Sequence, residues 1–187
     1  MSQRPCIVLD LNGTILQSVN RPLHFLLPGG TTGGRVPLSA RTRTKYVYLR
    51  PHAVAFLDWL TQRCRVGIWT SCVQHNAQEI VAAVVPPDVR ERFEFVLDRK
   101  DCVKLPGPGF RTIKDLRTVH ERFGWPPDRT WAVDDTDEKF SRQPDRLLRI
   151  PEYLAARDPY DEDRELLALA RTVSRLVERF APSDARK

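Results

Sequence analysis

The chain has 187 residues, which is enough for one domain, or one domain with an inserted lobe, and for a substantial core. Hydrophobic residues make up 41% and charged residues 29%, which is typical of a soluble globular protein. Lys and Arg number 30 against 24 Asp and Glu, and the formal net charge of +6 favours an anionic partner: a phosphorylated protein, nucleic acid or an acidic membrane surface. A solvated Arg-rich face explains this charge equally well.

The cysteines and the apolar stretches exclude other classes. The four cysteines form no CxxC pair, and three lie in or beside apolar runs, as buried thiols do. This argues against a disulfide scaffold or a zinc site and favours a reducing compartment. No signal peptide and no stretch long enough to span a bilayer is visible, so we expect an intracellular protein, nuclear or cytoplasmic, whose oligomeric state is unknown.

Short apolar runs of strand length alternate with helical patterns along the chain. The helical patterns run from Pro51 to Cys64, from Ala77 to Val84, from Ile113 to Phe123 and from about Glu162 to Phe180. This alternation predicts an α/β fold with a doubly wound, mostly parallel sheet covered on both faces. The expected strands are Cys6–Leu9, Val66–Trp69, Phe93–Leu97, Trp131–Val133 and Leu147–Ile150.

Residues 17–50 do not fit the alternation. The glycines of PGGTTGG, residues 28–34, mark a loop or hairpin tip, and the flanking segments HFLL and KYVYL are expected to form two strands. We interpret residues 17–50 as a small β insertion over the carboxyl edge of the sheet, within a single domain of residues 1–187.

Polar residues of particular kinds follow three of the expected strands. Asp10 follows the first, Thr70 the second, and Asp134 with Asp135 the fourth. The carboxyl ends of central strands meet at one edge of such a sheet, so we expect these side chains and Lys114 to lie together. Clustered carboxylates require a cation, and Mg²⁺ suits oxygen ligands. A magnesium ion, a lysine and a hydroxyl around one carboxylate suit phosphoryl transfer to an aspartate.

The same residues carry a resemblance to a known family. The segment LDLNGT, residues 9–14, resembles the DxDx[TV] motif of haloacid-dehalogenase-superfamily (HAD) phosphatases. More specifically, the chain resembles the phosphatases of the RNA polymerase II C-terminal domain (CTD) and their Nuclear-LIM-interactor-interacting relatives. The resemblance covers almost the whole chain and implies a HAD-like, Rossmannoid fold. The matching blocks are KYVYLRPHAVAFLDWL, VGIWTSC, RKDCVK, IKDLRTV, WAVDDTDEKF and PDRLLRIPEYLAARDPYDEDREL.

The resemblance implies catalytic roles for four positions. Asp10 would be the nucleophile that forms an aspartyl-phosphate, and would also bind Mg²⁺. Position 12, here Asn12, would be the general acid/base, with its backbone carbonyl on the metal. Thr70 would donate a hydrogen bond to a phosphate oxygen, and Lys114 would neutralise the phosphate and the aspartyl-phosphate.

The resemblance also implies binding roles. Asp134 and Asp135 would contact Mg²⁺ directly or through water, Thr14 would help to hold the phosphate site, and Ser71 would lie beside Thr70. In relatives, the insertion forms an apolar pocket that selects the residues next to the phosphoserine. The candidates for such substrate contacts are Arg99 near the motifs and Phe25, Leu26, Tyr46 and Tyr48 in the insertion; those four are equally compatible with the insertion's own core.

Asn12 departs from the family pattern, which has an aspartate at this position. An amide cannot donate a proton to the leaving oxygen or accept one from water, and losing a positioned acid/base costs about 10²–10⁴ in rate. Three explanations are open: an engineered substrate-trapping change, a natural change that leaves a slow or crippled enzyme or a binding protein, or proton transfer by another residue.

The leading interpretation is an Mg²⁺-dependent serine/threonine phosphatase that acts on a phosphorylated protein or peptide. The RNA polymerase II CTD is the leading substrate by family analogy. Two alternatives remain: a non-catalytic phosphopeptide-binding pseudophosphatase or scaffold, and a phosphatase acting on nucleic-acid ends. The positive charge would suit the latter, although the arginines form no dense basic run.

Overall fold

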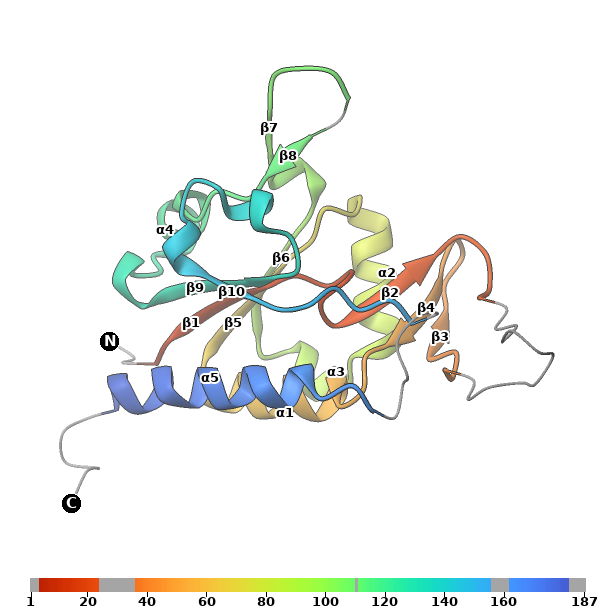
Figure 1. The fold of residues 1–187 in the computed structure, drawn as a ribbon, viewed down its shortest axis with the longest axis horizontal. Coiled ribbons are helices and arrows are strands. Elements are labelled where there is room, and N and C mark those ends of the chain that lie inside the picture. The colour runs from red at the N-terminus through yellow and green to blue at the C-terminus, as the bar shows by residue number, and fades with distance from the viewer. Residues whose placement is uncertain (1–3, 24–35, 110, 156–161, 182–187) are drawn as a thin grey trace.

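A computed structural model of the protein describes residues 4–23, 36–109, 111–155 and 162–181. Five parallel strands form the main sheet in the order β10-β9-β1-β5-β6, so the first strand of the chain lies in the centre (Figure 1). These strands confirm the predicted α/β fold. Their bounds are β1 Cys6–Leu9, β5 Arg65–Trp69, β6 Phe93–Leu97, β9 Thr130–Asp134 and β10 Leu147–Arg149.

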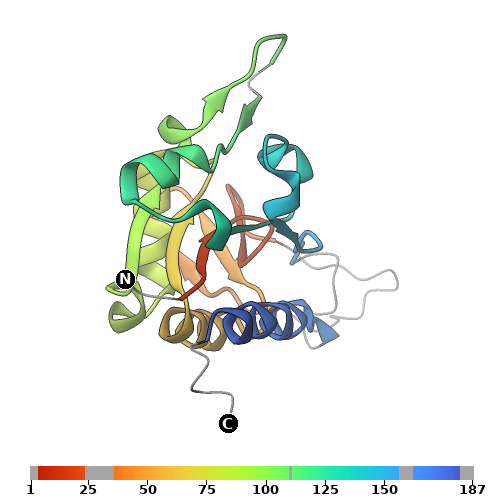
Figure 2. The same cartoon turned by 90° about the vertical axis from the view of Figure 1, so that its left-hand side faces the viewer.

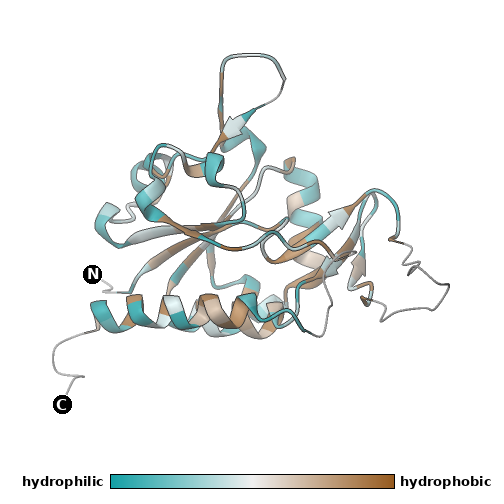
Figure 3. Ribbon diagram, in the orientation of Figure 1, coloured by the Kyte–Doolittle hydropathy of each residue, from teal (hydrophilic) through white to brown (hydrophobic). Residues whose placement is uncertain are grey.

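One face of the main sheet packs against three helices, α1 (Ala53–Arg63), α2 (Gln74–Val84) and α5 (Glu165–Phe180). Ile7 and Leu9 of β1 point to this face, since alternate side chains of a strand share a face. Helices α1 and α5 lie side by side (Figure 2). In Figure 3 apolar and hydrophilic residues alternate along α5, as expected for a helix buried on one side.

The opposite face packs against α4 (Arg117–Phe123) and the segment that follows it. Cys6 and Val8 of β1 point to this side and join Val119 and Trp125 in a second hydrophobic cluster. The sheet is therefore covered on both faces, and its polar strand ends are left at the edges. No helix in the described part of the chain is long and apolar enough to cross a membrane.

The third predicted helix is wrong in its first turn. Ile113 belongs to a two-stranded ribbon, where it pairs with Val103, and the helix begins at Arg117. Ile113 has the β-branched side chain that favours a strand, and its apolar spacing with α4 is coincidental. The remaining short elements are α3 Pro87–Arg90, η1 Arg99–Asp101, β7 Val103–Lys104, β8 Thr112–Ile113, η2 Pro127–Arg129, η3 Asp137–Phe140 and η4 Pro144–Arg146.

A small antiparallel sheet lies after the first strand, with the order β2-β4-β3. Its strands are β2 (Leu16–Val19), β3 (Ala40–Arg41) and β4 (Tyr46–Leu49). The KYVYL segment supplies β4, whereas HFLL at residues 24–27 lies outside the described residues. The small sheet pairs β4 with β2, which directly follows the loop that carries Asp10.

Arg50, at the end of β4, connects three parts of the fold while only 2% exposed. Its Nε donates to Asp163 Oδ2 at 2.9 Å. Its Nη1 donates to the carbonyls of Thr14, at 3.1 Å, and Pro151, at 2.9 Å. Asp163 in turn accepts a hydrogen bond from the Glu165 amide in the first turn of α5. Arg50 therefore joins the loop after β1, the segment after β10 and the start of α5.

Replacing Arg50 with methionine is expected to lower the free energy of unfolding by about 3–5 kcal/mol, because Asp163 is left buried without its partner. Arg43→Met is the matched control, since the Arg43 side chain is 75% exposed in its pair with Glu79 and should contribute little. Urea unfolding of both variants measures the difference, and Asp163→Asn added to Arg50→Met should recover part of the loss. Equal effects of the two arginine changes would contradict this interpretation.

Candidate active site

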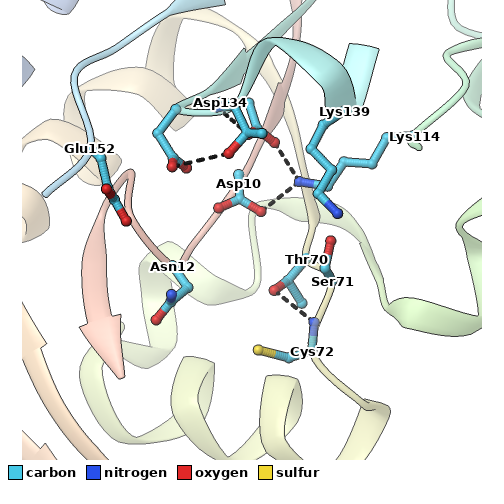
Figure 4. Close-up of a pocket in the computed structure, with 11 residues that line it drawn as sticks. Asp10, Asn12, Thr70, Ser71, Cys72, Lys114, Asp134, Lys139 and Glu152 are labelled. Atoms are coloured by element: carbon cyan, nitrogen blue, oxygen red, sulfur yellow. Dashed lines mark hydrogen bonds and ion pairs between the residues drawn. The ribbon is translucent and has the colours of Figure 1, made fainter. Parts of the chain in front are cut away.

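A cavity of about 300 Å³ opens at the carboxyl edge of the main sheet (Figure 4). The structure brings seven of the predicted residues together in its lining: Asp10, Asn12, Thr70, Ser71, Lys114, Asp134 and Asp135. Four further lining residues were not predicted: Cys72, Thr136, Lys139 and Glu152.

The order of the strands explains why these distant residues meet. Strand β1 lies between β5 and β9, and Leu9 is in register with Ile68 on one side and Val133 on the other. Asp10, Thr70 and Asp134, which come one or two residues later in their strands, therefore reach the same edge of the sheet. The backbone N–H of Asp10 donates to Val133 O at 2.9 Å, which fixes Asp10 beside the end of β9.

Lys114 contacts two carboxylates of the cavity, those of Asp10 and Asp134 (Figure 4). Its Nζ donates to Asp10 Oδ1 at 2.5 Å and to Asp134 Oδ2 at 2.6 Å. Burial alone would lower the pKa of Lys114, but the two carboxylates outweigh it and raise that pKa. The lysine therefore remains an ammonium ion that is 1% exposed, where its charge is poorly screened by water.

The carboxylates of the cavity carry more negative charge than Lys114 balances. Burial raises the pKa of Asp10 to about 7, against the opposing effect of Lys114 and with the help of Asp134. Burial also raises the pKa of Asp135, and the charges of Asp134 and Glu152 add to the effect. A site of this kind favours a bound cation, which would restore the ionised form of both groups.

Asp10 is expected to destabilise the metal-free protein at neutral pH. Its pKa is about 7 in the folded state against 3.8 ordinarily, so the folded state binds more protons between these values and stability falls as the pH rises through them. We expect wild type to lose stability relative to Asp10→Asn between about pH 4 and pH 7. Urea unfolding with a chelator at several pH values tests this, with the exposed Asp145→Asn as control. A constant difference between wild type and Asp10→Asn would contradict it.

The loop after Asp10 requires glycine at position 13. Gly13 has a φ of +93°, and a Cβ atom there would lie 2.7 Å from the Asp135 carboxylate. The Gly13 carbonyl accepts a hydrogen bond from the Tyr153 amide at 2.7 Å. Thr14 is fully buried, and its Oγ1 lies 3.5 Å from Asp135 Oδ1. The loop is thus held against Asp135 on one side and Tyr153 on the other.

The Asn12 side chain is engaged by the small sheet. Its Oδ1 accepts hydrogen bonds from the backbone N–H of Ser18 at 2.7 Å and from Ser18 Oγ at 2.9 Å. These bonds orient the amide oxygen toward β2. Asn12 therefore lines the cavity, but its amide has no acidic proton to transfer and no basic group that could accept a proton.

Thr70 and Ser71 lie in the cavity wall opposite Asn12 (Figure 4). Thr70 Oγ1 accepts a hydrogen bond from the Cys72 amide at 3.2 Å, which leaves its own proton to be donated. Ser71 Oγ is buried without a conventional hydrogen-bond partner among the described residues; the Cys102 thiol, a weak partner, is beside it. Arg99 is exposed, and its Nε donates to Ser71 O at 2.8 Å; it is not among the described residues that line the cavity.

Tyr46 and Tyr48, the two insertion candidates that the structure describes, are not brought to the cavity. Tyr48 is 3% exposed and packs with Val36 and Tyr153, and its hydroxyl accepts a hydrogen bond from the Leu23 amide. Tyr46 packs partly against the same cluster. Neither tyrosine is among the described residues that line the cavity around Asp10, and both belong to the core of the small sheet. Phe25 lies outside the described residues.

Glu152 and Lys139 were missed for different reasons. Glu152 follows β10, so the strand-end rule that pointed to Asp10 could have found it. Lys139 lies in η3, and its Nζ donates to Thr112 O and Oγ1 at 3.2 Å. Nothing in the spacing of DDTDEKF distinguishes this lysine from a solvated charge.

The donor set of the cavity fits a magnesium ion. Asp10 and Asp135 supply hard oxygen donors, and Mg²⁺ commonly needs only one or two carboxylates besides water and phosphate oxygens. Within the described ranges no three acidic, histidine or cysteine side chains are grouped so that they could hold a metal ion by themselves. Because position 13 is a glycine, the space in front of the Asp135 carboxylate stays open.

Comparison with known proteins assigns the chain to a family. Residues 5–186 match the family described as NLI interacting factor-like phosphatase. The chain belongs to this family. A CTD phosphatase-like protein of Invertebrate iridescent virus 3, protein 355R, is 25% identical over 136 residues, which are 68% of this chain and 72% of the viral protein. The resemblance on which the site was predicted is thereby confirmed at the level of the family.

Two solved structures of Fcp1 share the fold of this chain. One is the fission yeast RNA polymerase II CTD phosphatase Fcp1, a variant bound to beryllium fluoride, with a TM-score of 0.59, 16% identity and 94% of this chain covered. The other, described as an essential RNA polymerase II CTD phosphatase, has a TM-score of 0.57, 18% identity and 95% coverage. The chain spans about half the length of these Fcp1 chains, 51% and 52%.

Proposed function

We propose that the protein is a phosphatase that transfers the phosphoryl group of a phosphoserine or phosphothreonine to Asp10 and then to water. The observation that carries this proposal is the 2.5 Å contact of Lys114 with Asp10 inside a cavity that is also lined by Thr70. A carboxylate beside ammonium and hydroxyl donors is arranged to attack a phosphorus atom whose oxygens those donors stabilise.

Each of these contacts has a use in the proposed reaction. Lys114 holds Asp10 Oδ1, so Oδ2 is the oxygen that bonds to phosphorus as the bond to the serine or threonine oxygen breaks. Lys114 and the Thr70 hydroxyl offset the charge of the phosphate oxygens. Water then attacks the same phosphorus, Asp10 leaves as a carboxylate, and inorganic phosphate is released.

Magnesium would be held by the carboxylates of Asp10 and Asp135 and by the backbone carbonyl of Asn12. Both oxygens of Asp134 are engaged, one by Lys114 and one by the Thr136 amide, so Asp134 would orient the lysine and contact the ion through water. When bound, the ion supplies positive charge that offsets the phosphate oxygens.

The proposed substrate is a phosphorylated protein, with the RNA polymerase II CTD as the first to test. Support comes from the family and from the Fcp1 fold, although a shared fold is weak support for specificity. A substrate of this kind would place the protein in the nucleus.

Asn12 favours a second candidate function, a pseudophosphatase that binds phosphopeptides. The amide oxygen is engaged by Ser18 and lacks the proton chemistry of an aspartate. In this case the cavity would bind the phosphate, and turnover would be absent.

Phosphate release by wild type and Asn12→Asp, with and without Mg²⁺, tests these functions. The substrates are a CTD phosphopeptide, an unrelated phosphopeptide and a 5′-phosphorylated DNA oligonucleotide. Mg²⁺-dependent release from a phosphopeptide by wild type supports the phosphatase. Binding without release by wild type, together with release by Asn12→Asp, supports the pseudophosphatase. Faster release from DNA than from both peptides would contradict the protein substrate.

A further inference from the structure

We infer that Glu152 carries the proton-transfer function that Asn12 cannot perform, an inference that rests on the proposed phosphatase function. Glu152 lines the same cavity as Asp10. In the view of Figure 4, Glu152 and Asn12 lie on one side of Asp10, whereas Lys114 and Thr70 lie on the other. A carboxylate is therefore present on the side of the cavity where the family has its aspartate.

The backbone around Glu152 is fixed to the loop that carries the nucleophile. On one side, Pro151 O accepts from Arg50 Nη1 at 2.9 Å, and the same nitrogen donates to Thr14 O at 3.1 Å. On the other side, the Tyr153 N–H donates to Gly13 O at 2.7 Å. The residues on both sides of Glu152 are thus connected by hydrogen bonds to the loop at residues 13 and 14, Tyr153 directly and Pro151 through Arg50. These bonds fix the backbone from which the Glu152 side chain extends.

The other carboxylates of the cavity are already engaged. Asp134 uses one oxygen for Lys114 and the other for the Thr136 amide. Asp135 accepts from Thr136 Oγ1 at 3.1 Å and lies 3.5 Å from Thr14 Oγ1. By contrast, the Glu152 carboxylate makes no hydrogen bond or ion pair with another described residue, and it is exposed to water in the cavity. It is free to act on a leaving oxygen and on an attacking water.

The proton balance of the two steps closes with one carboxyl group. In the first step the Glu152 carboxyl gives its proton to the serine or threonine oxygen as the bond from that oxygen to phosphorus breaks. In the second step the Glu152 carboxylate takes a proton from the water whose oxygen bonds to phosphorus, while the Asp10–phosphorus bond breaks. Glu152 is then protonated again for the next substrate.

Glu152→Gln is the test, with Glu162→Gln as the matched control. Glu162 lines a neighbouring hollow with Glu152 and is not among the described residues that line the catalytic cavity. We expect Glu152→Gln to lower kcat on a phosphopeptide by about 10²–10⁴, with inhibition by inorganic phosphate unchanged. The leaving group of an aryl phosphate needs no proton, so Glu152→Gln should release one equivalent of the phenolate rapidly. The phosphoryl group should then remain on Asp10, where mass spectrometry would detect it.

The double variant decides whether Glu152 and position 12 share one function. Asn12→Asp should restore most of the rate in the Glu152→Gln protein but raise wild type much less, because the two carboxylates would serve the same step. A wild-type rate in Glu152→Gln, weakened phosphate binding, or no rescue by Asn12→Asp would overturn the inference while leaving the phosphatase function intact. No phosphate release by either wild type or Asn12→Asp would instead refute the proposed function.

Discussion

Hydrolysis of every phosphomonoester substrate is expected to fall by at least about 10⁴ when Asp10 is replaced by asparagine, because the reaction then has no nucleophile. The change is nearly isosteric, and Lys114 keeps its contact with Asp134, so the variant should fold. It should still bind inorganic phosphate, since Lys114 and the Thr70 hydroxyl remain. Steady-state kinetics with a phosphopeptide and an aryl phosphate measure the loss.

Asp145→Asn is the control for Asp10→Asn, because it removes an aspartate whose side chain is 77% exposed. The control should match wild type in both assays. Mass spectrometry of wild type quenched during turnover adds a direct observation, since one phosphoryl group should be found on Asp10. Turnover by Asp10→Asn at the wild-type rate would exclude an aspartyl-phosphate mechanism for this protein.

Lys114→Met is expected to affect both activity and stability. The variant leaves Asp10 and Asp134 facing each other in a buried site, which should lower the free energy of unfolding by about 3–5 kcal/mol at neutral pH. The loss should shrink at acid pH, where the carboxyls become protonated. Turnover should fall together with stability, because nothing then offsets the charge on the phosphate.

A second change separates the two effects of Lys114→Met. Adding Asp134→Asn removes one unpaired carboxylate, so urea unfolding should show recovered stability, whereas activity should remain lost. Lys139→Met is the matched control for stability, since Lys139 is half-buried and donates to the neutral oxygens of Thr112. A stability loss in Lys139→Met as large as in Lys114→Met would show that the buried carboxylate pair is not the cause.

The sequence predicted the sheet and most of the cavity because both follow from local patterns. Short apolar runs separated by helical spacing define parallel strands, and the carboxyl ends of central strands must meet. Asp10, Thr70 and Asp134 could therefore be grouped by their positions in the sequence alone. The role of each residue came from the family motif, and the geometry alone does not assign it.

Other features depend on contacts between distant segments and leave no local pattern. Arg50 is a buried connector whose partner, Asp163, is 113 residues away in the sequence. Lys114 was expected at the start of a helix, whereas it follows β8. Glu152 also follows a strand, but β10 is an outer strand, and nothing in the sequence indicates a role for this carboxylate. Its place in the cavity became relevant because the Asn12 amide is engaged by Ser18.

The central position of β1 has a consequence for how the protein is made. This strand is synthesised well before its neighbour β9, which begins at Thr130, and Asp163, the partner of Arg50, comes later still. A nascent chain that ends before these segments has no means of assembling the phosphate site around Asp10. Such long-range pairing is typical of slow folding. The protein is therefore expected to acquire its activity only after β9 and Asp163 have been synthesised, and fragments that end before β9 should be inactive and prone to aggregate.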